Sequence, residues 1–77
     1  TAEGKVGIKM NVHQKNIAKV LKLLPSLKGP TISPLTQEGW FDIDTVADER
    51  AVRELVPQLK RAGAQGIIEY PLNKVIP

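Results

Sequence analysis

Few residues of this 77-residue chain are of the types that perform chemistry. His13 is the single histidine, and no serine and carboxylate stand at a recognisable spacing from it, so we interpret it as a polar surface residue in the first turn of a helix. The chain has no cysteine, which excludes disulfides and thiolate metal sites, and one histidine cannot form a histidine-rich site. The sequence therefore predicts neither catalytic residues nor a metal site.

Asp42 and Asp44 are the other candidates for chemistry. Residues two apart on a strand share a face, and paired carboxylates can carry out acid–base catalysis. Solvent or neighbouring lysines around two strand residues would explain the pair equally well. We favour that structural interpretation, and a small enzyme stays an alternative only if both aspartates line a pocket and have a shifted acidity.

The glycine-rich segment Gly63-Ala64-Gln65-Gly66 is a weak candidate for a phosphate-binding loop. It follows a predicted helix instead of opening one, and it lacks the basic residue and the hydroxyl of a P-loop. We interpret it as the C-terminal cap of that helix at Gly63, followed by a close approach of the backbone.

Hydrophobic periodicity predicts the elements that must position these residues. Apolar and polar residues alternate from Lys5 to Asn11, which is typical of a half-buried strand. Asn11-Val12-His13-Gln14 resembles a capping box and predicts the start of a helix that ends at Pro25. The apolar stripe of this helix consists of Ile17, Val20, Leu21 and Leu24.

A second helix is predicted after Asp48, which we interpret as its N-cap. Pro57 lies inside this helix and must cost one backbone hydrogen bond. The last strand runs from Gln65 to Tyr70 and stops at Pro71. The apolar stripe of the second helix consists of Val52, Leu55, Val56 and Leu59.

The segment Gly29-Pro30-Thr31-Ile32-Ser33-Pro34-Leu35, followed by Gly39-Trp40, breaks this regular pattern. Prolines fix φ and remove backbone donors, so the part from Thr31 to Leu35 is interpreted as an edge strand or a shaped loop, of the kind that forms the wall of a ligand site. Resistance to pairing with other chains would explain the prolines as well. We expect this part to form a hairpin with a strand from Trp40 to Val46.

The order strand, helix, strand, strand, helix, strand predicts an α+β fold, the ferredoxin-like plait, with an antiparallel four-stranded sheet and two helices on one face. The helices should cover the face that carries Val6, Ile8, Met10, Phe41 and Ile43. No predicted element covers the opposite side, so water, a ligand or another subunit must meet it. This open face carries Lys9, Asn11, Trp40, Asp42 and Asp44.

The formal net charge of +3 is distributed unevenly. Lysines dominate as far as Lys28, and acids crowd between Glu38 and Glu54. We favour the interpretation of a solvated helix face, and a surface that attracts an acidic partner or another copy of the chain is the alternative. Apart from Trp40, the open face lacks the aromatic side chains that stack on RNA bases, which argues against nucleic acid as a partner. No apolar run approaches the roughly twenty residues that span a bilayer, so we expect no membrane contact and a cytoplasmic location.

The length predicts a single domain over residues 1–77. A core of this size is limited, so help from a partner is expected. Because the chain starts at Thr1 and not at methionine, we expect a domain excised from a longer protein.

The chain resembles the C-terminal regulatory domain of the long-form ATP phosphoribosyltransferase, and the tail from Tyr70 to Ile76 is similar to that of archaeal members. The resemblance runs from about Lys5 to Ile76. It is carried by Leu27, Gly29-Pro30-Thr31-Ile32-Ser33-Pro34-Leu35, Gly39-Trp40, Leu59, Ala62-Gly63-Ala64 and Gly66-Ile67-Ile68.

This resemblance implies a domain without catalytic residues that belongs to a glycosyltransferase of histidine biosynthesis, whose catalytic domains are absent from this chain. In that family the domain binds L-histidine, the end product, and mediates allosteric feedback inhibition. The implied effector contacts are Asn11, Leu27, Thr31, Val46 and Gly66. Many relatives have an aspartate at the position of Asn11, so the contact of this residue with a charged group is expected to be weaker.

The resemblance also implies that regulatory domains associate through their sheets about a threefold axis, as a trimer within a hexamer. Histidine bound between neighbouring domains would favour a compact hexamer. No cofactor is implied for this domain, and Mg²⁺ is expected only for the catalytic domains. The alternative is a free-standing ferredoxin-like module of the nitrogen-regulator type that binds a metabolite or mediates oligomerisation.

Overall fold

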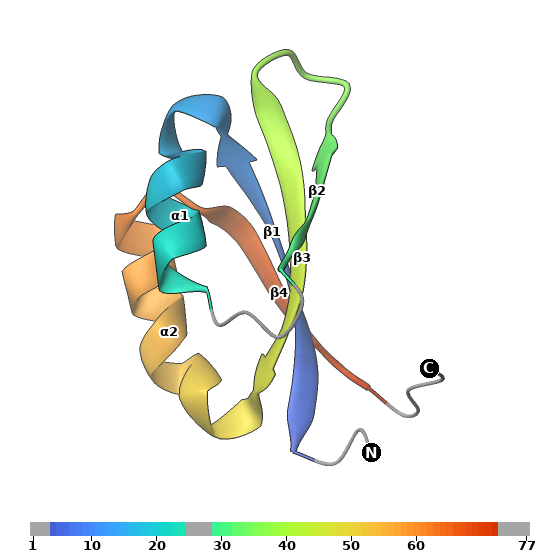
Figure 1. The fold of residues 1–77 in the computed structure, drawn as a ribbon, viewed down its shortest axis with the longest axis vertical. Coiled ribbons are helices and arrows are strands. Elements are labelled where there is room, and N and C mark those ends of the chain that lie inside the picture. Colours follow the sequence, from blue (N-terminus) through green and yellow to red (C-terminus); the bar gives the residue numbers. More distant parts are fainter. Residues whose placement is uncertain (1–3, 25–28, 73–77) are drawn as a thin grey trace.

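The computed structural model describes residues 4–24 and 29–72 of the chain. Its strands and helices follow the predicted order, so the ferredoxin-like α+β prediction is confirmed (Figure 1). The elements are β1 (Lys5–His13), a 3-10 helix η1 (Gln14–Asn16), α1 (Ile17–Leu23), β2 (Thr31–Pro34), β3 (Trp40–Asp48), α2 (Glu49–Arg61) and β4 (Gln65–Pro71).

The four strands form one sheet in the order β2-β3-β1-β4. All three pairings, β2 with β3, β3 with β1 and β1 with β4, are antiparallel, and the predicted hairpin of β2 and β3 is present. The pairing of β1 with β4 shifts its register between Lys9 and Asn11, which marks a bulge. The sheet thus places β2 and β4 at its two edges.

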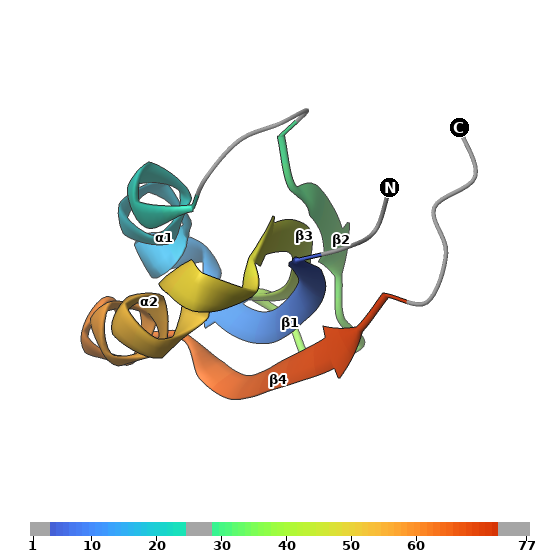
Figure 2. The same cartoon turned by 90° about the horizontal axis from the view of Figure 1, so that it is seen from below.

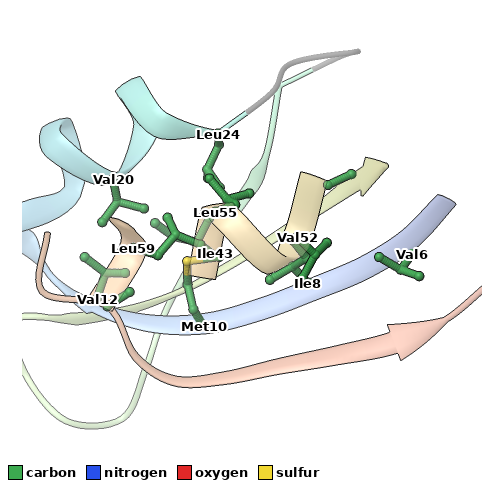
Figure 3. Packing of buried hydrophobic residues seen from close by; sticks show 12 residues of the cluster. Val6, Ile8, Met10, Val12, Val20, Leu24, Ile43, Val52, Leu55 and Leu59 are labelled. Atoms are coloured by element: carbon green, nitrogen blue, oxygen red, sulfur yellow. The ribbon is translucent and has the colours of Figure 1, made fainter. Parts of the chain in front are cut away.

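Both helices pack on the same face of the sheet (Figure 2). Alternation along β1 turns Val6, Ile8, Met10 and Val12 toward the helices, and each of them is buried. Figure 3 shows these side chains meeting the apolar stripes of α1 and α2. The core consists of Val6, Ile8, Met10, Val12, Val20, Leu24, Ile43, Ala47, Val52, Leu55, Leu59 and Ala64.

The predicted helix start at Asn11 is wrong. Asn11 lies inside β1, because the ladder between β1 and β3 continues as far as the pair of His13 with Trp40. His13 ends the strand and is the N-cap of η1, where its Nδ1 accepts a hydrogen bond from the Lys15 backbone N–H at 3.2 Å. His13 is therefore not in the first turn of a helix, and the capping box does not form.

The predicted bounds of α2 agree with the structure at both ends. Asp48 is its N-cap, although the Asp48 carboxylate makes no capping hydrogen bond and lies 2.5 Å from Lys5 Nζ. At the other end Gly63 has φ +106°, and the N–H groups of Gly63 and Ala64 donate to the carbonyls of Lys60 (3.1 Å) and Leu59 (3.0 Å). These two bonds form a Schellman motif, so the predicted glycine cap is confirmed.

The prolines have different roles in the fold. Pro57 lies on an exposed position within α2, Pro34 ends the edge strand β2, and Pro71 is the last residue of β4. Pro25, at which the first helix was expected to end, lies outside the described residues. Neither α1 nor α2 is long and apolar enough to cross a membrane.

Candidate functional site: the open face of the sheet

The register of the four strands arranges the side chains of the open face in rows that run across the sheet. Next to the pair of Lys5 with Asp48 at one end lies an apolar row, formed by Val46, Gly7 and Tyr70. The next is the central row, formed by Thr31, Asp44, Lys9 and Ile68. It is followed by the polar row, formed by Ser33, Asp42, Asn11 and Gln65, and by the pair of Trp40 with His13.

Lys9 connects the central row with the polar row. Its Nζ lies 2.7 Å from Asp42 Oδ1 and 3.8 Å from Asp44 Oδ2. The Asp42 side chain is only 11% exposed, whereas that of Asp44 is 31% exposed. One lysine thus serves two aspartates, which agrees with the structural interpretation of this pair.

The two carboxyl groups shift each other's acidity in opposite directions. A hydrogen bond from the Asp44 carboxyl lowers the pKa of Asp42, and Lys9 lowers it further. The same contact with Asp42 raises the pKa of Asp44, and partial burial adds to this effect. The hydrogen bond to Asp42 raises the pKa of Lys9. As the pH falls, Asp44 therefore takes up a proton before Asp42.

Neither aspartate lines the hollow that the structure describes at the start of α2. The hollow found at the start of α2 is lined by other residues, namely Gly4, Asp48, Glu49, Arg50 and Ala51. This hollow therefore gives no support to acid–base catalysis by the pair. Within residues 4–24 and 29–72, no group of three or more His, Asp or Glu side chains is arranged to hold a metal ion.

Two of the expected effector contacts, Asn11 and Gly66, lie next to each other. Gly66 has φ +57° and stands in the bulged part of β4. A Cβ on Gly66 would lie 3.7 Å from Asn11 Nδ2, so the two residues are close enough to contact one small ligand. The asparagine side chain is half-buried and is paired across the strands with Asp42.

The other expected contacts lie around Asp44. Thr31 begins β2, is exposed and faces Asp44 directly across the hairpin. Val46 lies two residues beyond Asp44 on the same face of β3 and is 37% exposed. Strand geometry puts about 13 Å between the rows of Asn11 and Val46, with the central row between them. Leu27, the fifth expected contact, lies outside the described residues.

Sequence reasoning missed the aromatic and aliphatic side chains that β4 adds to the open face. Ile68 is 52% exposed and Tyr70 is 37% exposed, and both face β1 partners of the open face. The Tyr70 ring lies over Gly7, so close that a Cβ on this glycine would overlap the ring. A glycine inside a strand often marks such a close approach, and this was the signal in the sequence.

Comparison with known proteins gives the family of the chain. A family model described as "HisG, C-terminal domain" matches residues 2–74. The chain belongs to this family. Its relatives include proteins named ATP phosphoribosyltransferase from Solibacter usitatus, 52% identical over 75 residues, and from Thermodesulfovibrio yellowstonii, 58% identical over 76 residues. The match covers 97% and 99% of this chain but only 26% of each relative, so this HisG C-terminal domain spans about a quarter of their length.

Among solved structures, the domain is similar to that described as "Crystal Structure of Arabidopsis thaliana PII bound to citrate". The TM-score is 0.74, and the likeness covers 96% of this chain and 80% of the other. The sequences are only 16% identical, so the likeness concerns the fold alone. It supports the ferredoxin-like plait and gives no argument for the alternative of a nitrogen-regulator module.

Proposed function

We propose that this domain is the regulatory part of an ATP phosphoribosyltransferase of histidine biosynthesis, and that it binds L-histidine on the open face for feedback inhibition. Its membership of the HisG C-terminal domain family supports the assignment to this enzyme. In this proposal, phosphoribosyl transfer, and any Mg²⁺ that it uses, is assigned to the remainder of a longer chain, because the match covers only 26% of each relative. This domain supplies the effector site.

The observation that carries the proposal is the composition of the open face around the central row. A free amino acid needs acceptors for its ammonium group, donors for its carboxylate and polar partners for its imidazole. Carboxylates, hydroxyls and amides of all four strands meet here, as Asp44, Thr31, Ser33, Asn11 and Gln65. Gly66 adds a position where backbone groups can approach the ligand closely.

Association of regulatory domains would complete the site. The open face exposes Val46, Ile68 and Tyr70, which together form an apolar margin beside the polar rows. Burying this margin against a second copy would stabilise the small domain, because its own core is limited. In the proposed arrangement three regulatory domains form a trimer, two trimers form the hexamer, and histidine between neighbouring domains favours the compact state.

Isothermal titration calorimetry of this domain with L-histidine tests the proposal, with L-glutamine and AMP as control ligands. Sedimentation at the same protein concentration, with and without histidine, reports the oligomeric state. We expect saturable binding of histidine alone, together with a trimer that histidine stabilises. A trimer that gives no heat with histidine, or a domain that neither binds histidine nor associates, contradicts the proposal.

A further inference from the structure

Asp44 lies at the centre of the proposed effector contacts. It faces Thr31 across the hairpin, and Val46 follows it two residues later on the same side of β3. Asn11 pairs with Asp42, so it is a diagonal neighbour of Asp44 in the sheet. A ligand that contacts Thr31 and Asn11 of one copy of the domain therefore lies close to the Asp44 side chain.

The charged side chains of the central row and the polar row sum to one negative charge. Asp42 and Asp44 carry two carboxylates, and Lys9 is the single cation within 4 Å of them among the described residues. Lys9 is placed closer to Asp42, at 2.7 Å, than to Asp44, at 3.8 Å. The unmatched negative charge is therefore located mainly on Asp44.

Asp44 is also the more accessible of the two carboxylates. Its side chain is 31% exposed, whereas that of Asp42 is 11% exposed and already holds the shorter contact with Lys9. An ammonium group can approach Asp44 without displacing Lys9 from Asp42. Its cross-strand partner on β2, Thr31, carries no charge that would compete with a cationic ligand.

We propose that the Asp44 carboxylate binds the α-ammonium group of the amino-acid effector and thereby selects ligands that carry this group. The inference rests on the proposed function, because it names the charged contact of the same site. It also explains how a domain with the neutral Asn11 on the open face can hold a cationic group. A charge-assisted hydrogen bond from ammonium to carboxylate is about twice as strong as a neutral one.

The test compares two ligands and three proteins by calorimetry. The ligands are L-histidine and its deamino analogue 3-(imidazol-4-yl)propanoate, which lacks only the ammonium group. The proteins are the wild type, Asp44→Asn, and Asp48→Asn as a control. Asp48 lies on the same strand and the same face, and its carboxylate pairs with Lys5 instead. Circular dichroism verifies that each variant is folded.

We expect the wild type to bind histidine at least about tenfold more tightly than the analogue, since hydrogen bonds to charged groups contribute about 1.5–3 kcal/mol. Asp44→Asn should lose most of this preference, because it weakens the binding of histidine and leaves the binding of the analogue unchanged. Asp48→Asn should keep the preference. A wild type that binds histidine and its analogue equally well overturns the inference without any variant. So does an Asp44→Asn protein that keeps the full preference. A wild type that binds neither ligand instead refutes the proposed function on which the inference rests.

Discussion

The aromatic ring of Tyr70 lies over Gly7, its cross-strand partner on the open face. A Cβ on Gly7 would overlap Cζ and Cε2 of the ring, so the absence of a side chain on β1 allows the tyrosine to lie across the sheet. Val46 on β3 is the other cross-strand partner of Gly7, so the glycine lies between Val46 and Tyr70 in the apolar row and adds no side chain of its own. The shape of the open face thus depends on one position in its central strand.

Replacing Gly7 by alanine should therefore act through Tyr70. We expect Gly7→Ala to lower the free energy of unfolding by about 1 kcal/mol, because the ring must leave its position. In a Tyr70→Ala background the same change should be neutral or stabilising, since alanine is preferred to glycine inside a strand. Urea unfolding of the four proteins measures the coupling, and an equal effect of Gly7→Ala in both backgrounds would refute the contact.

The aspartate pair should make the stability of the domain depend on pH in two opposite ways. Asp42 has a lowered pKa in the folded state, so its contribution is complete above its usual pKa of 3.8 and is lost as the pH falls through the lowered value. Asp44 has a raised pKa, so the folded state keeps its proton to a higher pH than the unfolded state does. The stability of the domain therefore falls as the pH rises from 3.8 through the raised value.

Urea unfolding between pH 3 and pH 7 can separate these two contributions. Asp42→Asn should be destabilising at pH 7 and less so at pH 3. Asp44→Asn should become more favourable, relative to the wild type, as the pH rises above 3.8. The opposite ranking of the two variants at pH 7 would show that the directions of the pKa shifts are assigned to the wrong residues.

Of two glycines with positive φ, Gly63 and Gly4, replacement by alanine is expected to destabilise the domain more at Gly63. At Gly63, with φ +106°, an added Cβ would overlap the Asn16 side chain, whereas at Gly4, with φ +78°, nothing lies within 4 Å. Gly4→Ala should therefore cost only backbone strain, about 1 kcal/mol. Gly63→Ala should cost more, because it also disturbs the Schellman motif and the contact with η1. Thermal unfolding gives the comparison, and equal losses would contradict it.

His13 should contribute to stability as an N-cap. His13→Ala removes the acceptor for the Lys15 N–H and the edge-to-face contact with Trp40, whose ring centroid is 5.4 Å away, so we expect a loss of about 1 kcal/mol or more. His13→Asn should recover part of the loss, because asparagine is a good N-cap residue. Trp40 is the single tryptophan, so its fluorescence follows unfolding in both variants. Identical stabilities of the two variants would argue against a capping role.

The sequence predicted the faces of the strands better than the ends of the elements. Period-two alternation assigned Val6, Ile8 and Met10 to the core, because burial follows this alternation when one face is covered. The ends of β1 depend on its partner instead. Asn11 is a good cap residue, but the continued pairing with β3 outweighed this local preference.

The composition of the open face could be predicted only in part, for a similar reason. Which residues meet across strands depends on the register, and a bulge in β4 sets the register of Ile68 and Tyr70 opposite Lys9 and Gly7. Lys9 and Asp42 were both expected on this face, but their contact follows from the three-dimensional pairing alone. The expected histidine contacts came from resemblance, and their role stays a prediction.

The most direct test of the central claim is a titration of the ¹⁵N-labelled domain with L-histidine, followed by two-dimensional NMR. If histidine binds on the open face, the amide signals of Asn11, Thr31, Asp44, Val46 and Gly66 should shift and saturate together. The signals of the exposed sides of α1 and α2 should stay in place. Shifts confined to the helices would contradict the account. So would a spectrum that histidine leaves unchanged although the domain has associated into a trimer.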